Sequence, residues 1–256
     1  MKTIFAETIV RSPLLSGVPG LRHGFTTRKL GSMAGQIHSR DEQATNRAAL
    51  EAAIELRLIK ASQVHSADVV LVERGIATRL RDGASEPVSS AMRLEGDALI
   101  TRERGIGLAV AVADCAPILL VTPDGWIAAA HAGWEGTTKR IVGAVRDAIA
   151  ARGGRIVDAR AVIGPAIGGC CYRIDAARAA LIRERLGDTA SLVGPVDGRF
   201  DFAIADELAA QLRAAGVPRI DVLDRCTRDE VGTFFSHRGE DGKAGRGLAF
   251  IGWSQA

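Results

Sequence analysis

Short runs of apolar and β-branched residues recur along the 256-residue chain, separated by clusters of Gly, Pro and polar residues. Such runs, bounded by turn residues, are typical of β-strands. We expect strands at Asp68–Glu73, Asp97–Thr101, Gly107–Ala113, Ile118–Thr122, Trp126–Ala130, Arg160–Ile163, Arg219–Leu223 and Gly247–Trp253. The tetrapeptide TPDG, which joins two of these runs, predicts a tight turn and therefore a β-hairpin.

Helices are predicted where apolar residues recur with a period of 3.6 and a capping residue precedes them. The first predicted helix is capped by Asp41 and runs through NRAALEAAIELR, and the second starts at Thr137 or Thr138 and ends before Gly153. The third is capped by Asp175 and ends at Gly187, and the fourth starts at Asp201 or Asp206 and ends at Gly216. Several neighbouring strands are joined by loops too short for a helix. The pattern therefore favours a mixed-sheet α/β (α+β) fold rather than pure βαβ alternation.

The chain shows no internal repeat and no low-complexity segment, and we expect a single domain over residues 1–256. The stretch Arg79 to Ser90, RLRDGASEPVSS, is rich in Ser with one Gly and one Pro. Such composition predicts a surface loop within that domain rather than a domain boundary.

Charge and composition argue against a nucleic-acid-binding protein and against a membrane protein. Lys plus Arg number 33 and Asp plus Glu number 30, so the net charge is +3, and no run of like charges suggests a nucleic-acid partner. The most apolar region, Ile106 to Val121, is interrupted by Asp114 and Pro117, which argues against a membrane span. With no signal peptide at the N-terminus, we expect a cytoplasmic enzyme whose four cysteines are reduced thiols or metal ligands. The sequence makes no prediction of oligomeric state.

Three side chains stand at the ends of predicted strands, where functional groups are commonly presented. His65 precedes a strand, Cys115 lies where a buried strand stops, and His131 ends the run WIAAA before a Gly-containing turn. The predicted hairpin brings Cys115 and His131 toward each other. One thiolate and two imidazoles suit zinc with an open fourth position, and copper is chemically feasible as well. The alternative is that Cys115 is a small buried apolar residue and the two histidines are only hydrogen-bonded.

The remaining candidates have weaker signals. Asp114, beside Cys115, could orient one of the histidines or could cap the loop after the strand. The adjacent cysteines Cys170 and Cys171 are interpreted as structural, because a vicinal pair rarely forms a disulfide. Cys226 has no His or Cys near it in sequence and is interpreted as structural too.

Three arginines lie in glycine-rich or turn-like surroundings: Arg28 in GFTTRKLG, Arg238 in FFSHRGED and Arg246 in KAGRGLAF. Arginine is well suited to bidentate binding of oxyanions. We expect Arg28 and Arg246 to bind a phosphate or a ribose, with solvated surface charge as the alternative.

Eight segments, taken in order, resemble one family. They are HGFTTR, QVHSADV, EGDALIT, GIGLAVAVADCAPILLV, AAAHAGWEGT, AVIGPAIGGCCYRI, CTRDEVGTFFSHR and AGRGLAFIGW, from about His23 to Trp253. The chain is similar in these segments to the YfiH family, also called laccase-domain proteins, purine nucleoside phosphorylases or peptidoglycan editing factors. The resemblance implies that His65, Cys115 and His131 bind a catalytic metal, usually zinc. It also implies an α/β domain similar to that of toxin-type cysteine hydrolases.

The chain departs from the family pattern at two places. The loop after Arg28 is shortened to KLGSMAGQIHS, and it is expected to lie near the substrate pocket. Ala166 stands where the family commonly has a further cysteine, which weakens the case for chemistry at Cys170 and Cys171.

The resemblance implies a zinc-dependent purine nucleoside enzyme whose partners are a nucleoside and phosphate. It would phosphorolyse adenosine, inosine and methylthioadenosine, and zinc-activated water could also deaminate adenosine. Zinc nucleobase deaminases carry a Glu in an H-x-E motif. The chain has no H-x-E, so the proton donor would come from elsewhere, with Asp114 and Glu135 as candidates.

Other functions remain open. Cys115 could act as a nucleophile with His131 as its base, in a hydrolase that edits peptidoglycan precursors. A non-enzymatic binding module would show no turnover. Multicopper oxidation needs many more histidine ligands than the five present (His23, His38, His65, His131 and His237), so copper would support at most a weak phenol oxidation.

Overall fold

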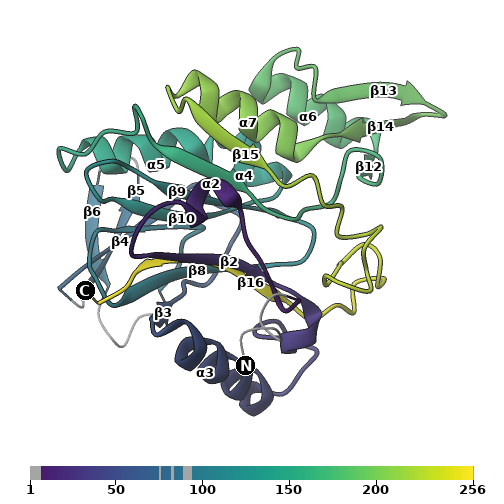
Figure 1. Cartoon of the computed structure of the whole chain (residues 1–256). Coiled ribbons are helices and arrows are strands. Elements are labelled where there is room, and N and C mark those ends of the chain that lie inside the picture. Colours follow the sequence, from purple (N-terminus) through teal and green to yellow (C-terminus); the bar gives the residue numbers. More distant parts are fainter. Residues whose placement is uncertain (1–6, 75, 82–83, 89–93, 256) are drawn as a thin grey trace.

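Two β-sheets stacked face to face form the centre of the molecule, and helices cover the outer face of each sheet (Figure 1). The computed structural model describes residues 7–74, 76–81, 84–88 and 94–255. The layers run from α3 (Arg40–Ile54) through a five-stranded sheet and an eight-stranded sheet to a group of helices on the far side.

The eight-stranded sheet has the order β15-β11-β9-β10-β7-β4-β5-β6. Its strands are β15 (Arg219–Val222), β11 (Arg160–Ile163), β9 (Ala116–Val121), β10 (Ile127–Ala132), β7 (Ala98–Thr101), β4 (Val69–Glu73), β5 (Ile76–Arg81) and β6 (Ala84–Val88). The pairs β11–β15 and β4–β7 are parallel and the other pairs are antiparallel, so the sheet is mixed.

The five-stranded sheet has the order β1-β2-β16-β8-β3. Its strands are β1 (Ile9–Val10), β2 (Leu21–Thr26), β16 (Gly247–Trp253), β8 (Ile106–Val112) and β3 (Arg57–Ile59). Only the β3–β8 pair is parallel. Because β8 belongs to this sheet and β9 to the other, the short connection between them passes from one sheet to the other.

The remaining helices and a small third sheet lie beyond the eight-stranded sheet (Figure 1). The helices there are α4 (Trp134–Thr138), α5 (Ile141–Ala150), α6 (Ala176–Leu186) and α7 (Ile204–Ala214), and the small sheet has the order β12-β14-β13, with β12 (Arg173–Ile174), β13 (Leu192–Val196) and β14 (Arg199–Phe202). Two short helical turns, α2 (Pro13–Ser16) and η1 (Arg28–Leu30), flank β2.

Alternate residues of the central strands pack into different layers. In β9, Ile118 and Leu120 pack with the helices α5 and α7, whereas Leu119 and Val121 pack between the two sheets. On the outer side of the five-stranded sheet, Phe250 of β16 packs with apolar residues of α3. Central strands of the eight-stranded sheet are therefore apolar on both faces, which explains their uninterrupted hydrophobic runs.

The predicted mixed α/β class is confirmed, and each of the eight predicted strands is present with small shifts at its ends. The TPDG turn joins β9 to β10, which pair antiparallel as predicted. These eight strands are divided over the two large sheets, which bury their facing apolar sides against each other.

The prediction of a surface loop from Arg79 to Ser90 is wrong over most of its described part. Residues 79–81 belong to β5, and residues 84–88 form β6, the edge strand of the eight-stranded sheet. An edge strand can contain Pro, here Pro87, because one side of its backbone needs no partner. The polar composition of this stretch therefore suggested a loop, although its residues form a hairpin that is stabilised by backbone pairing of β5 and β6.

The helices are present, but several predicted starts are wrong. Ser39, not Asp41, caps α3, with its hydroxyl accepting from the Glu42 N–H at 3.1 Å. Thr137 and Thr138 end α4 rather than start α5. The fourth helix, α7, begins at Ile204, between the two acidic residues that the sequence suggested. By contrast, the predicted Asp175 cap and Gly187 end of α6 are confirmed.

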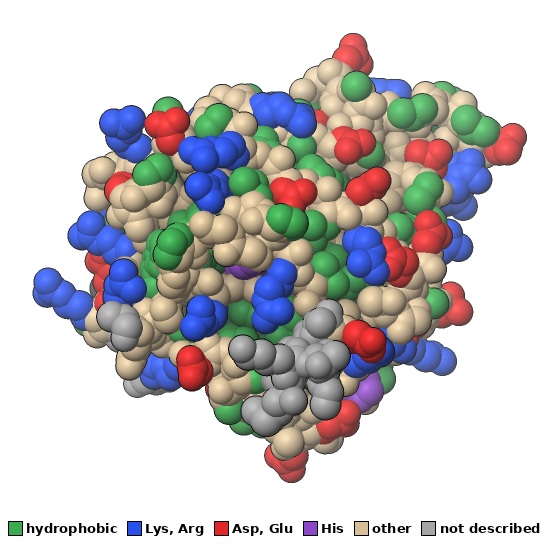
Figure 2. Space-filling view, in the orientation of Figure 1, with side chains coloured by type: hydrophobic (Ala, Val, Ile, Leu, Met, Phe, Trp, Pro, Cys, Tyr) green, Lys and Arg blue, Asp and Glu red, His purple; other side chains and the backbone are tan. Residues whose placement is uncertain are grey.

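No helix in the described part of the chain has the length and apolar character needed to cross a bilayer. On the face shown in Figure 2, Lys and Arg side chains are interspersed with Asp and Glu side chains. This face therefore has no single sign of charge, in keeping with the small net charge of the chain.

Candidate active site

The candidate site lies at one end of the two stacked sheets. Cys115 lies on the connection that passes from β8 to β9, directly before Ala116, which pairs with Ala132 of β10. His131 is the last residue but one of β10. His65 lies on the loop between β3 and β4, with a left-handed backbone (φ 57°). The antiparallel register of β9 and β10 thus brings the thiol and the His131 imidazole to the same end, as the predicted hairpin requires.

The three side chains meet in space. One ligand atom from each of His65, Cys115 and His131 lies within 4.8 Å of the others. The imidazole rings of His65 and His131 are 5.2 Å apart between centroids and nearly edge to face, at 70°. His131 is buried, Cys115 is half-buried and His65 is exposed, so the group opens to solvent on one side.

Asp97, directly before β7, positions His131. Oδ1 of Asp97 lies 2.9 Å from Nδ1 of His131, and Nε2 is left as the ring nitrogen that can face the thiol. Oδ2 accepts from the Ser66 N–H at 2.7 Å, the Ser66 hydroxyl at 2.9 Å and the Val64 N–H at 3.1 Å. One fully buried carboxylate therefore holds His131 and also the loop that carries His65.

Electrostatics couple the three groups. Burial by itself raises the pKa of the Cys115 thiol, but the charge of His131 and hydrogen bonds from both histidines lower that pKa to about 6. Burial lowers the pKa of His131, whereas Cys115 and Asp97 raise it to about 9. Hydrogen bonding to Cys115 raises the pKa of His65. Without a metal, the site therefore favours a thiolate paired with an imidazolium.

The donor set fits a borderline metal ion such as zinc. One thiolate and two imidazoles are ligands that zinc prefers, and a carboxylate behind one histidine is the usual supporting group. The space beside the sulfur is kept by Gly133, since a Cβ there would lie 2.8 Å from Cys115 Sγ and 3.5 Å from His65 Cδ2. His65, Cys115 and His131 could together hold one metal ion with an open position toward solvent.

Asp114 does not orient a histidine. Its carboxylate accepts from the Thr227 and Ser236 hydroxyls, both at 2.7 Å, and from the Arg238 N–H at 2.6 Å. The residue is buried and has φ 83°. Of the two interpretations of Asp114 drawn from the sequence, the structure supports the anchoring of loops and not the orienting role, which belongs to Asp97.

A cleft of about 750 Å³ opens above the three side chains, a volume suited to a small-molecule ligand. Its wall combines aromatic rings, cations and carboxylates. The polar and aromatic lining residues besides the three are Gln36, Lys60, Ser62, Gln63, Asp114, Trp134, Glu135, Tyr172, Arg178, His237, Arg238 and Arg246. Ala34, Gly35 and Gln36 also belong to the wall, so the shortened loop after Arg28 reaches the cleft as expected.

Of the two arginines predicted to bind an oxyanion, Arg246 lies at the cleft and Arg28 does not. Arg246 lines the cleft, and its Nη1 donates to the carbonyls of Ala244 and Gly245 at 2.7 and 2.9 Å. The residues that line the cleft do not include Arg28. Its guanidinium pairs with Glu240 at 2.8 Å and lies 4.7 Å from the ring centroid of Phe235. Arg28 therefore stabilises the segment that contains Arg238 and Arg246.

Sequence reasoning missed four residues that shape the site: Asp97, Tyr172, Arg178 and Trp134. The guanidinium of Arg178 lies 5.3 Å from the ring centroid of Trp134, and that of Arg238 lies 5.3 Å from that of Tyr172. Pairing the predicted strand that begins at Asp97 with the predicted strand that directly precedes His131 would have placed the carboxylate beside the imidazole. No local sequence pattern predicts these two arginine–aromatic contacts, because each joins residues that are far apart in the sequence.

Glu135, one of the two candidate proton donors, is among the residues that line the cleft. It stands in the first turn of α4, and Oε2 accepts from Lys139 Nζ at 2.8 Å. Lys139 Nζ also donates to the carbonyl of His65 at 2.6 Å. The ion pair therefore connects α4 to the loop that carries the exposed ligand candidate.

A family model described as "Multi-copper polyphenol oxidoreductase laccase" matches residues 21–254. The chain belongs to this laccase family. The crystal structure of the hypothetical protein YfiH from Bacillus licheniformis superposes with a TM-score of 0.83 at 27% identity, covering 97% of each chain. The resemblance to the YfiH family and the α/β domain expected from it are therefore confirmed.

Two relatives of the chain carry names of purine nucleoside enzymes. A protein named purine nucleoside phosphorylase YlmD, from Geobacillus stearothermophilus, is 39% identical over 212 residues, covering 77% of this chain and 72% of that protein. A protein named adenosine deaminase RL5, from an unknown prokaryotic organism, is 32% identical over 187 residues, covering 71% and 69%. In the described part of this chain, only the His65 group combines histidines with a cysteine, which does not match the many histidines of a multicopper centre.

Proposed function

We propose that the cleft is the active site of a zinc-dependent purine nucleoside enzyme that phosphorolyses adenosine, inosine and methylthioadenosine and deaminates adenosine more weakly. The observation that carries the proposal is the convergence of His65, Cys115 and His131 at the base of a cleft lined by aromatic and cationic side chains. The names of the two relatives are consistent with a purine nucleoside as the substrate.

His65, Cys115 and His131 would hold the zinc ion. When bound, zinc would supply Lewis-acid activation of water or of a substrate oxygen. Asp97 keeps the Nδ1 proton of His131 and so directs Nε2 toward the cleft. The exposed position of His65 leaves the approach to the site open.

The wall of the cleft offers two kinds of contact for a nucleoside and phosphate. The Trp134 and Tyr172 rings, each held by an arginine, present apolar surface against which a purine can stack. Arg246 and Arg238 supply guanidinium groups for phosphate oxygens. Arg28 would act on phosphate binding through its contacts with Glu240 and Phe235.

In phosphorolysis, a phosphate oxygen forms a bond to C1′ while the C1′–N9 bond breaks, and the bonding pair leaves on the purine, which takes up a proton. The guanidinium groups would hold the phosphate against C1′ and balance its charge. In deamination, water replaces the 6-amino group, and a nearby acid must protonate the departing amine. Glu135 is the better candidate for this acid, because Asp114 is committed to three hydrogen bonds in the adjacent loops.

The test is to incubate zinc-loaded protein with adenosine, inosine or methylthioadenosine, with and without phosphate, and to separate the products. Free base and ribose 1-phosphate that appear only with phosphate would support phosphorolysis, and inosine formed from adenosine in both conditions would support deamination. Cys115→Ala, prepared in parallel, should remove both activities. A zinc-loaded protein that turns over none of the three nucleosides would overturn the proposal.

A Cys–His hydrolase is the second candidate, favoured by the Asp97–His131–Cys115 arrangement. A carboxylate holds an imidazole that in turn lowers the pKa of a thiol to about 6, which is the arrangement of an activated nucleophile. Such a thiolate would be alkylated at once by iodoacetamide in the protein as purified. A thiolate bound to zinc would resist alkylation until a chelator is added.

A further inference from the structure

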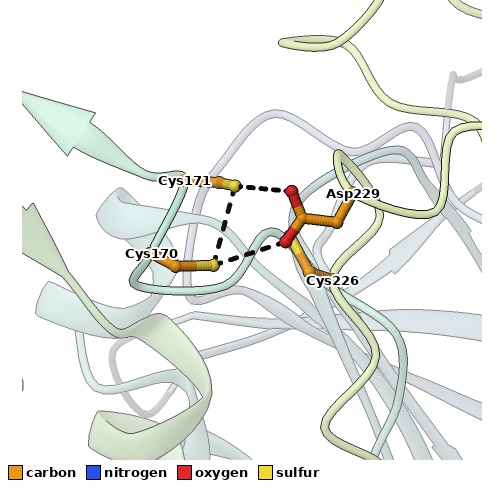
Figure 3. Close-up of side chains that lie close together, drawn as sticks. All are labelled: Cys170, Cys171, Cys226 and Asp229. Atoms are coloured by element: carbon orange, nitrogen blue, oxygen red, sulfur yellow. Dashed lines mark hydrogen bonds between the residues drawn. The ribbon is translucent and has the colours of Figure 1, made fainter.

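A second group of metal-binding side chains lies outside the proposed active site. Cys170 and Cys171 belong to the loop between β11 and β12, and Cys226 and Asp229 belong to the segment after β15. Figure 3 shows the side chains of the two segments directed toward one another. All four cysteines of the chain carry free thiols, so these three sulfur atoms are available as ligands.

The spacing of the four ligand atoms suits a single small metal ion. Sγ of Cys170 and Sγ of Cys171 are 3.6 Å apart, and Asp229 Oδ1 and Oδ2 lie 3.1 Å from Cys171 Sγ and 3.6 Å from Cys170 Sγ. One ligand atom from each of the four residues lies within 4.8 Å of the others. In a tetrahedral zinc site, bond lengths of about 2.3 Å to sulfur and 2.0 Å to oxygen put sulfur atoms ~3.8 Å apart and sulfur ~3.5 Å from oxygen.

The backbone holds the two segments in this arrangement. Gly168 donates its N–H to Cys226 Sγ at 3.3 Å, and the Cys171 N–H donates to the Gly168 carbonyl at 3.0 Å. A Cβ at Gly168 would lie 3.0 Å from Cys170 Sγ and 3.5 Å from Cys226 Sγ. Backbone bonds between Ala166 and the residues on either side of Cys226 join the two segments directly. The sulfur atoms are therefore gathered by main-chain structure and do not depend on long flexible side chains.

We propose that Cys170, Cys171, Cys226 and Asp229 bind one zinc ion, separate from the ion assigned to His65, Cys115 and His131. Three thiolates and one carboxylate complete a four-coordinate shell, which is the character of a structural zinc site rather than a catalytic one. A disulfide is a poorer fit, because a vicinal bridge is strained and any single bridge leaves one of the three sulfurs unused.

The position of the site gives it a structural role next to the cleft. Tyr172, which follows Cys171, lines the cleft, and so does Ile167 of the same loop. Thr227, which follows Cys226, donates its hydroxyl to Asp114, the neighbour of Cys115. A metal ion that bridges the two segments would therefore stabilise one wall of the cleft and the connection that carries Cys115.

The test uses the full-length Cys115→Ala chain, in which the first metal site lacks its thiolate, titrated with Co²⁺ under reducing, anaerobic conditions. We expect one cobalt ion per chain, tetrahedral d–d bands and sulfur-to-cobalt charge-transfer absorption. Adding Cys226→Ser should weaken cobalt binding and lower the charge-transfer absorption. Asp229→Asn should weaken binding while keeping that absorption, and Asp224→Asn, an exposed acid of the same segment, is the matched control that should change neither.

A second measurement guards against misfolding of the Cys115→Ala chain. The unsubstituted chain loaded with Zn²⁺ should hold two ions, and Cys170→Ser combined with Cys226→Ser should reduce this to one. Absence of cobalt binding in the Cys115→Ala chain together with one zinc ion in the unsubstituted chain would overturn the proposal. So would a disulfide among Cys170, Cys171 and Cys226 found by mass spectrometry in freshly reduced protein exposed to zinc.

Discussion

Asp97 contacts His131 twice: its carboxylate lies 2.9 Å from Nδ1 of the ring, and its carbonyl accepts the His131 N–H at 2.7 Å. The second carboxylate oxygen holds the backbone at Val64 and Ser66, on either side of His65. Asp97 thus sets the distance between two of the three proposed metal ligands. The strand that follows it, β7, pairs with β10, which contains His131, so sheet register and ligand geometry are coupled.

Replacing Asp97 by Asn should weaken zinc binding by about 10- to 100-fold, the usual cost of losing a carboxylate behind a histidine ligand. The amide would present an N–H₂ group either to His131 or to the N–H donors of Val64 and Ser66. Zinc affinity is measured by competition with a chromophoric chelator. Asp147→Asn, which removes an exposed acid on α5, is the control. Equal affinity in Asp97→Asn and the parent protein would show that the contact does not support metal binding.

Replacing Gly133 by Ala should lower activity by about 100-fold with little loss of folding stability. The added Cβ would lie 2.8 Å from Cys115 Sγ, and displacement of a reacting group by about 1 Å can lower a rate by about 100-fold. The backbone of Gly133 has φ −82°, which Ala adopts freely, so the effect would come from this contact alone.

Gly143→Ala in α5 is the matched control, because a Cβ there meets nothing within 4 Å. It should leave activity unchanged and stabilise the protein by about 0.5–1 kcal/mol through helix propensity. Activity and thermal unfolding of the two variants are compared side by side. Full activity in Gly133→Ala would mean that the thiol position is not critical.

In metal-free protein, alkylation of Cys115 should follow a pKa of about 6 instead of the usual value of about 8.5. The thiolate is the reactive form, so the rate should stay at its plateau above pH 7 and fall as the pH drops through 6. Iodoacetamide labelling at several pH values, with peptide mapping to separate Cys115 from the other cysteines, measures the profile. His131→Ala should move the inflection to higher pH, since His131 supplies the charge that stabilises the thiolate. An inflection near 8.5 in the parent protein would contradict the predicted pairing.

Replacing Arg246 by Ala should raise the KM for phosphate by about tenfold or more, because a hydrogen bond to a charged group contributes about 1.5–3 kcal/mol. Arg28→Ala should raise it less, since Arg28 is not among the residues that line the cleft. Arg246→Lys keeps the positive charge but loses the planar guanidinium that can bind two phosphate oxygens at once, so its KM for phosphate should lie between those of the parent protein and Arg246→Ala. Steady-state kinetics with phosphate varied provide the comparison. An equal rise in Arg28→Ala and Arg246→Ala would mean that both arginines reach the substrate.

Local sequence pattern predicted the central strands well, because these strands are buried on both faces and must be continuously apolar. It failed for the hairpin of β5 and β6 and for the small strands of the third sheet. Of those strands, β6, β12 and β13 lie at sheet edges, and β5 and β14 pair with them there, so hydrogen bonding to a neighbour replaces hydrophobic burial as the main stabilising contact. The start of α5 was misplaced for a similar reason: Arg140 in a left-handed conformation breaks one apparent helix into two, and nothing in the apolar period marks the break.

By itself the sequence determined the mixed α/β class, the hairpin between Cys115 and His131, and the three candidate ligands at strand ends. Tertiary structure decided which carboxylate supports the ligands, since Asp97 and His131 are 34 residues apart, and it placed Asp114 in the loop anchors instead. It also brought Cys171 within reach of Asp229, 58 residues away. Such contacts depend on strand register and on how distant segments pack, whereas periodicity and capping report only the conformation of neighbouring residues.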